Sequence, residues 1–182
     1  DKAIRDMGQL QKSKKRLQRE PWEKLAETFL TVYRVEKKWK ERSAALFRSA
    51  EALDHLARCA SNAKDARRSV DRYLQLVRLY PKSSLADDSL CAIAEKMLCQ
   101  LEQPAARSGY QLHHTPRVGQ ALAAKARSAY GARELRRAVD RAVEQALADQ
   151  IASGTACVGQ HWTADCSADG AIVLREDETA TL

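Results

Sequence analysis

Side chains that bind metals gather near the C-terminal end of the chain, where Cys157, His161 and Cys166 follow one another at short intervals. Thiolate and imidazole are preferred zinc ligands; a structural site takes four, whereas a hydrolytic site takes three and a water. The spacing of these three residues matches no common zinc motif. The alternatives are ordinary tail residues or an exposed disulfide between Cys157 and Cys166, and we predict no metal.

Two adjacent histidines, His113 and His114, precede Pro116 in a predicted loop that covers residues 102–116. They could supply half of a metal site. Adjacent histidines in a loop are more often solvated, because a complete site needs further ligands from other segments. We therefore interpret both as solvated loop residues.

Asp87 and Asp88 are adjacent carboxylic acids, a residue type that serves in general acid–base catalysis. Both residues fall in the first turn of a predicted helix, where the helix dipole favours negative charge, so a structural role suffices. The sequence contains no glycine-rich phosphate loop and no serine, histidine and acid set in a recognisable context. We predict no catalytic residue and no cofactor, and the sequence leaves open whether the chain belongs to an enzyme.

The composition is typical of a helix-rich protein, because alanine, leucine, arginine, lysine and glutamate lose least on entering a helix. The charge is unevenly distributed. Residues 1–150 carry 30 basic and 19 acidic side chains, whereas residues 151–182 carry one basic and five acidic side chains. This contrast predicts a basic helical body and an acidic tail. No run of 18 apolar residues exists, so we predict no membrane span.

One stretch of the chain repeats itself at a shift of 44 residues: residues 22–59 align without a gap with residues 66–103. Six pairs are identical at this shift: Leu30/Leu74, Arg34/Arg78, Lys38/Lys82, Leu46/Leu90, Ala50/Ala94 and Glu51/Glu95. A period of this size is typical of stacked helical hairpins, none of which can bury its apolar face alone.

Polar residues predict where these helices begin and end. Ser61 and Asn62 interrupt the apolar spacing and offer a cap for the helix that follows. Pro81 stops that helix, because a residue before proline is pushed away from helical angles. Ser84 is the predicted cap of the next helix.

The sequence thus predicts an all-α fold of antiparallel helical-hairpin repeats with a poorly structured C-terminal tail. The hairpins cover about residues 22–65 and 66–109, and further helices cover about 118–151. Together they form a domain over residues 1–150. Residues 151–182 form the acidic tail, which we expect to be weakly ordered or fragmentary.

Two segments of the chain resemble known protein families. The run Tyr73–Leu90, with its Tyr-Pro-Lys-Ser junction, resembles tetratricopeptide-like repeats of bacterial envelope proteins. The upstream residues are similar to the N-terminal region of periplasmic N-acetylmuramoyl-L-alanine amidases: Leu10–Arg16, Arg19, Trp22, Phe29 and Tyr33. The resemblance implies a tetratricopeptide-like solenoid and a periplasmic or cell-envelope location.

Four repeat-related residues are candidates for a binding surface: Tyr33, Arg34, Tyr73 and Arg78. Repeat arrays bind extended peptides along such surfaces, and arginines can bind carboxylates in a bidentate manner. We therefore expect a protein-interaction module with a protein or peptide partner, which the resemblance places at the cell wall.

Two alternatives stay open at this stage. The first is an N-acetylmuramoyl-L-alanine amidase, a cell-wall hydrolase whose zinc catalytic domain is absent from this chain. The second is a basic nucleic-acid-binding helical protein. The second is disfavoured because the sequence has no helix-turn-helix signature and no aromatic residues interleaved with basic ones.

Overall fold

The structure of the chain is a computed structural model that describes residues 2–127 and 132–177. The chain divides into two compact units, Asp1–Ser89 (unit 1) and Leu90–Leu182 (unit 2). The division falls within one long helix, α5 (Ser84–Arg107), which begins in unit 1 and ends in unit 2.

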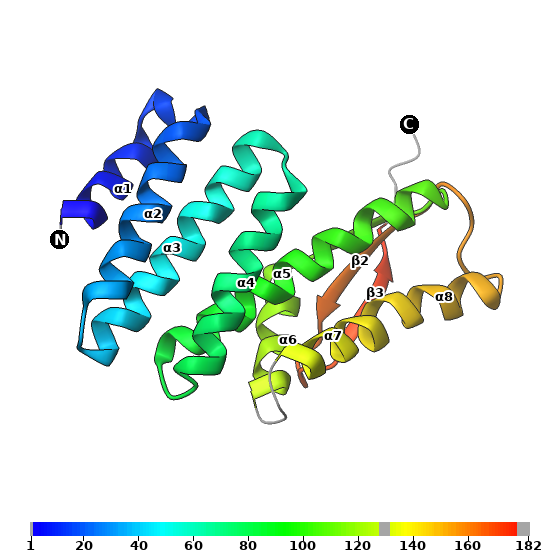
Figure 1. The fold of residues 1–182 in the computed structure, drawn as a ribbon. Coiled ribbons are helices and arrows are strands. Elements are labelled where there is room, and N and C mark those ends of the chain that lie inside the picture. The colour runs from blue at the N-terminus through cyan, green and yellow to red at the C-terminus, as the bar shows by residue number, and fades with distance from the viewer. Residues whose placement is uncertain (1, 128–131, 178–182) are drawn as a thin grey trace. The chain divides into compact units, whose positions relative to one another are not determined.

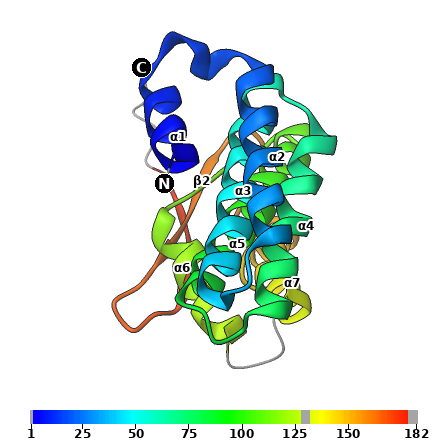
Figure 2. The ribbon, with the colours of Figure 1, turned by 60° about the vertical axis from the view of Figure 1, so that its left-hand side comes forward.

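Unit 1 is entirely helical in its described part (Figure 1). Its elements before α5 are α1 (Lys2–Lys12), the 3₁₀ turn η1 (Lys14–Leu17), α2 (Arg19–Val35), α3 (Trp39–Ala60) and α4 (Ala63–Leu79). Helices α2, α3 and α4 pack side by side in chain order (Figure 1). The turn η1 links the end of α1 to the start of α2 (Figure 2).

Local capping accounts for the boundaries of these helices. Ser61 ends α3 in the left-handed conformation, with φ 46°, and the Oδ1 atom of Asn62 accepts a hydrogen bond of 2.9 Å from the Lys64 amide. The predicted cap of α4 is therefore confirmed. The cap of α5 differs from the prediction by one residue, because Ser83 Oγ, not Ser84, accepts from the Leu85 amide at 3.3 Å.

The core of unit 1 joins the first three helices. Its buried members come from α1, α2 and α3: Met7, Leu10, Trp22, Leu25, Ala26, Phe29, Ala52, Leu53 and Leu56. Trp22 is 1% exposed, and its indole N–H donates to the Arg16 carbonyl at 2.8 Å. This hydrogen bond fixes η1 over the core while the ring stays buried.

Buried hydroxyls link neighbouring helices of unit 1. Ser49 on α3 donates to the Ala26 carbonyl of α2 at 2.9 Å, and Ser69 on α4 donates to the Ala50 carbonyl of α3 at 3.0 Å. Because a buried hydroxyl without a partner is costly, these bonds favour one relative placement of the three helices.

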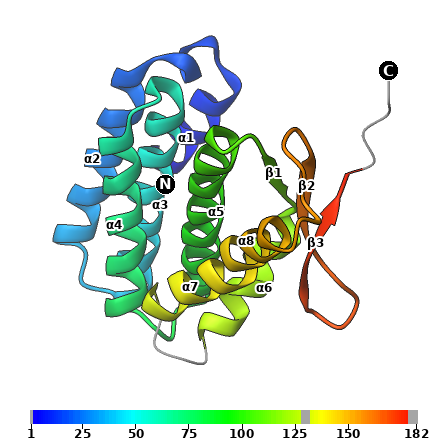
Figure 3. The same ribbon diagram turned by 90° about the vertical axis from the view of Figure 1, so that its right-hand side faces the viewer.

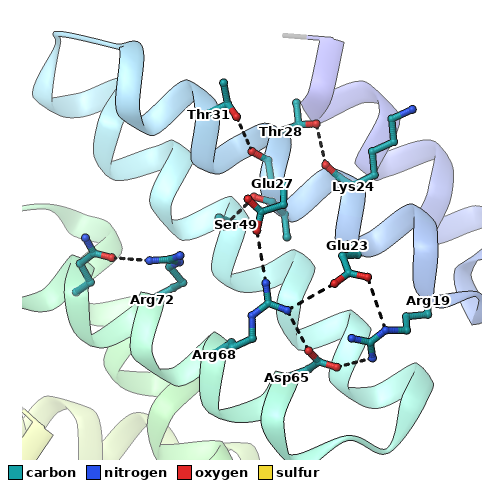
Figure 4. A network of polar contacts seen from close by, with 12 residues as sticks. Arg19, Glu23, Lys24, Glu27, Thr28, Thr31, Ser49, Asp65, Arg68 and Arg72 are labelled. Atoms are coloured by element: carbon teal, nitrogen blue, oxygen red, sulfur yellow. Dashed lines mark hydrogen bonds and ion pairs between the residues drawn. The ribbon is translucent and has the colours of Figure 1, made fainter.

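A buried carboxylate connects α4 to α2 (Figure 4). Asp65 is 1% exposed and lies 2.5 Å from Arg19 Nη1 and 3.2 Å from Arg68 Nη1. Arg68 also pairs with Glu23 and Glu27 on α2. The hydrogen bond from Arg19, and then that from Arg68, lower the pKa of Asp65 against the opposing effect of burial.

Unit 2 combines helices with a small sheet (Figure 3). Its elements after α5 are β1 (Gln111–His114), α6 (Pro116–Arg127), α7 (Ala132–Val139), the π-helical turn η2 (Asp140–Glu144), α8 (Gln145–Ala152), β2 (His161–Cys166) and β3 (Ile172–Glu176). Strand β2 is central: it pairs in parallel with β1 and antiparallel with β3. The helices from α6 to α8 form the crossover that a parallel pair of strands requires.

The core of unit 2 draws on both strands and helices. Its buried apolar side chains include Leu112, Val118, Leu122, Leu135, Val139, Val143, Leu147, Trp162 and Ala164. Strand β2 lies against α6, and β3 lies against η2. The apolar residues at four-residue spacing, Leu135, Val139, Val143 and Leu147, thus form a buried stripe.

The prediction of an all-α fold is correct for most of the chain and wrong for the sheet. Strand β1 and the last turns of α5 replace the predicted loop over residues 102–116, and α5 accommodates Pro104 before ending at Arg107. Gly109, with φ 87°, then closes a Schellman-type end in which the Tyr110 amide donates to the Ala105 carbonyl at 2.9 Å. Two strands also lie within the segment expected to be weakly ordered; its residues 178–182 lie outside the described ones.

The 44-residue shift recurs in the helix boundaries. Helices α2 and α4 have 17 residues each, and both their first and their last residues are 44 apart. The predicted domain boundary near residue 150 stays a prediction.

We predict that Asp65→Asn lowers the free energy of unfolding by about 1–3 kcal/mol, because two arginines lose their charged acceptor inside the helix packing. Asp71→Asn, at an exposed position of the same helix, is the matched control and should change stability by less than about 0.5 kcal/mol. Urea unfolding followed by circular dichroism measures both.

The pH dependence of this effect has a defined sign. The pKa of Asp65 lies below its ordinary value of 3.8 in the folded state. The stability it contributes is therefore fully present above that value and is lost as the pH falls through the folded pKa. The difference between wild type and Asp65→Asn should shrink in acid, and a difference that grows there would contradict the assignment.

Candidate functional site

The end of α5 presents chemically reactive side chains to strand β1. Glu95, Cys99 and Glu102 are spaced four and three residues apart, so they lie along one face of the helix. His114 is the last residue of β1, and its side chain is 11% exposed. Cys99, Glu102 and His114 each direct a ligand atom to a common point, with all three atoms within 4.8 Å of one another.

Both ring nitrogens of His114 are engaged by carboxylates. Nε2 lies 2.9 Å from Glu95 Oε2, and Nδ1 lies 3.2 Å from Glu102 Oε1. A ring held at both nitrogens cannot rotate without losing a charge-assisted contact. The imidazole is thus fixed in orientation by two side chains that lie about two turns apart on the same face of α5.

The absence of a side chain at position 119 makes room for one of these carboxylates. A Cβ atom at Gly119 would lie 2.2 Å from Glu95 Oε1. Gly119 is buried in α6, so this helix packs closely against the face of α5 that carries Glu95. Glycine at this position therefore allows the carboxylate to reach His114.

The surroundings of His114 favour its cationic form. A hydrogen bond to Cys99, followed by the hydrogen bond to Glu95, raises the pKa of His114 to about 9, although burial opposes the shift. The residue is an imidazolium near neutral pH in the absence of a bound metal. In this state it cannot act as a general base, but it is the centre of a compact ion-pair cluster.

Strand geometry explains why the two adjacent histidines differ. His113 is exposed, whereas His114 shares a face of β1 with the buried Leu112, because successive side chains of a strand point to opposite sides. The interpretation of both as solvated loop residues is therefore wrong for His114.

The three C-terminal residues singled out in the sequence do not form a ligand cluster. His161 and Cys166 are the first and last residues of β2, so roughly 16 Å of extended strand separates them. Cys157 is exposed, and neither Cys157 nor Cys166 is in a disulfide. Instead, His161 lies near His113, with 6.4 Å between the ring centroids.

The candidate binding residues of unit 1 fall into two groups. Tyr73 is 3% exposed and packs edge-on against Phe47 with ring centroids 5.5 Å apart, and burial raises its pKa. The Arg42 guanidinium lies 4.9 Å over the half-buried Tyr33 ring. Arg34 and Arg78 are exposed at equivalent places near the ends of α2 and α4. The binding role of these residues stays a prediction.

The family comparison concerns mainly unit 2. A family model described as the C-terminal, D2-small domain, of ClpB protein matches residues 85–164. The match begins at the start of α5 and ends within β2, and it covers less than half of the chain. No curated protein matches the chain. Over the matched residues, the chain is similar to a domain of an AAA+ chaperone.

This finding corrects the resemblance drawn from the repeat. The identification with a tetratricopeptide-like N-terminal module of an amidase is wrong, and so are the cell-envelope function, the amidase alternative and the periplasmic location that depended on it. The Tyr-Pro-Lys-Ser junction leads into α5, and α5 belongs to the matched segment together with β1 and α6–α8. The resemblance at this junction involves only neighbouring residues, so it could not predict which elements pack against α5. Within the described ranges, every helix falls short of the length and hydrophobicity that a bilayer crossing requires.

The cluster around His114 has no recognisable pattern in the sequence. Cys99 and Glu102 carry a helical spacing that many surface residues share, and His114 is 12 residues beyond Glu102. The chain reverses between them at Gly109, which brings β1 back along α5. If residues 111–114 had been predicted as a strand, the alternation of side chains between its two faces could have indicated that His114 points inward.

We predict that metal-free His114 titrates at about pH 9 when followed by NMR of its ring protons, and that Glu95→Gln lowers this midpoint. Because the folded pKa exceeds the ordinary value of 6.5, the stabilisation from this cation is complete below pH 6.5 and is lost as the pH rises through about 9. A midpoint at or below 6.5 would show that the two carboxylates do not hold the ring.

Proposed function

We propose that unit 2 acts as a ClpB-type D2-small domain, so that the chain belongs to an AAA+ chaperone-related protein. The observation that carries this proposal is the family-model match over residues 85–164. The matched residues include α5, β1 and α6–α8, which are the elements that supply most of the unit 2 core. The match therefore spans most of the elements of unit 2 rather than a short motif.

The chemistry of the described residues supports an accessory role for this unit. Among the residues that the structure covers, its cluster of ligand-type side chains is half-buried and pairs His114 with two carboxylates. An imidazolium between carboxylates stabilises a fold but does not abstract a proton at neutral pH. Unit 2 thus contributes shape and contacts rather than bond cleavage.

A domain exchange tests this proposal. We expect that a ClpB whose D2-small domain is replaced by residues 84–177 of this chain folds and retains more chaperone activity than ClpB truncated before that domain. Leu135→Asp in the chimaera should abolish the gain, because Leu135 is fully buried and a buried carboxylate costs several kcal/mol. Arg136→Ala, at the exposed neighbouring position, is the matched control and should keep it. A folded chimaera no more active than the truncated protein would refute the proposal.

For unit 1 we propose a helical-hairpin array whose second hairpin opens with α4 and continues into α5. The equal lengths and 44-residue offset of α2 and α4 support this. So do equivalent buried residues, since Phe29 and Tyr73 are both buried, as are Ala50 and Ala94.

We also propose that unit 1 supplies a surface for a protein or peptide partner. Each hairpin ends its first helix with an exposed arginine followed by an exposed apolar residue: Arg34-Val35 in α2 and Arg78-Leu79 in α4. Val35 is 71% exposed and Leu79 is 50% exposed. A repeated pair of this kind combines a bidentate donor with an apolar contact, which suits acidic peptide segments.

The double substitution Arg34→Ala/Arg78→Ala tests the partner proposal. Since both residues are exposed, the variant should unfold at the same temperature as wild type. We expect at least tenfold weaker binding of acidic, leucine-containing peptides selected on the wild-type chain from a display library. Arg5→Ala, exposed on α1, is the control. Unchanged peptide binding by the double variant would remove the proposed surface.

A further inference from the structure

We propose that Cys99, Glu102 and His114 form a binding site for a divalent transition-metal ion, with Zn²⁺ as the ion that fits the ligands best, and that Glu95 positions His114 for it. The site lies wholly within unit 2, between α5 and β1. It does not depend on the ClpB-type assignment.

The ligand set selects the class of metal. One thiolate, one imidazole and one carboxylate are the three donor types that zinc accepts in proteins, whereas magnesium and calcium bind oxygen ligands. Together a thiolate and a carboxylate supply two negative charges, which a divalent cation neutralises. Thiolate and imidazole also exclude an assignment as a hard-cation site.

The distances suit a tetrahedral ion after small side-chain adjustments. Two nitrogen or oxygen ligands of one zinc ion are roughly 3.3–3.5 Å apart. His114 Nδ1 and Glu102 Oε1 are 3.2 Å apart, and the three ligand atoms all lie within 4.8 Å of one another. Cys99 is exposed, so core packing does not hold its side chain away from the other two ligands.

The surroundings of His114 match those of a metal-bound histidine. Such a histidine almost always donates its second ring N–H to a carboxylate or carbonyl, which fixes the tautomer and the orientation of the ring. Glu95 Oε2 lies 2.9 Å from Nε2, the nitrogen opposite the one that faces Glu102. Gly119 leaves the space in which Glu95 reaches this position. Glu95 is therefore a positioning residue and not a ligand.

Three protein ligands leave a fourth position for water or another ligand. Cys99 is exposed and the side chain of Glu102 is 38% exposed, so this position faces solvent. The site is thus reachable by a metal ion in the folded protein.

The test uses the full chain, stripped with a chelator and kept reduced. We expect calorimetry to give one Zn²⁺ per chain with a micromolar or tighter Kd, and Co²⁺ to produce the absorption bands of a tetrahedral thiolate complex. Cys99→Ser should remove the thiolate charge-transfer band, and His114→Gln should weaken Zn²⁺ binding at least 100-fold. Glu95→Gln should weaken binding about 10–100-fold while the Co²⁺ spectrum keeps its thiolate band.

Matched controls separate this site from the other thiols and histidines of the chain. Cys157→Ser and His113→Gln should leave the affinity and the spectrum unchanged, because Cys157 is exposed in another segment and His113 lies on the opposite face of β1. Circular dichroism shows whether each variant is folded. If His114→Gln unfolds, Cys99→Ser still tests the site, because Cys99 is exposed and its substitution should leave the fold intact. Absence of binding at tens of micromolar Zn²⁺, or binding that survives Cys99→Ser with its spectrum intact, overturns the proposal.

Discussion

The contact between His114 and the two carboxylates of α5 is the constraint on which the organisation of unit 2 depends. It fixes the end of β1 against α5 through both ring nitrogens, each at hydrogen-bonding distance. Hydrogen bonds that involve charged groups contribute about 1.5–3 kcal/mol each, more than a neutral pair. Strand β1 is also the parallel partner of β2, so its placement sets the position from which the whole sheet extends. Gly119 allows the same contact from the side of α6.

Unit 1 relies on a comparable arrangement with the charges exchanged. There a buried carboxylate, Asp65, is held by two arginines, one on its own helix and one on α2. In each of these two arrangements a charged side chain that is largely removed from water meets two oppositely charged side chains, and at least one of these belongs to a different element. Such groups specify how elements pack, since any other placement leaves a charge without partners.

The similarity to the D2-small domain of ClpB assigns α5 a second structural role. In the proposed hairpin array this helix closes the second hairpin. By the family match it opens a mixed helix-and-sheet segment that continues to β2. Both relations concern the same residues, because α5 is long enough to take part in both units. The repeat identified helices correctly, yet it could not show which neighbours α5 has toward its C-terminal end.

The sequence by itself determined the helices and their apolar faces. Period and capping are local properties, so the boundaries near Asn62 and the buried stripe from Leu135 to Leu147 could be predicted from residues a few positions apart. Tertiary structure alone decided the sheet and the cluster at His114. Strand β1 pairs with a segment some 50 residues away, and Cys99 meets His114 only after the chain reverses at Gly109. The partners of a short strand and the ligands of a composite site are fixed by distant segments, and no pattern within either segment carries that information.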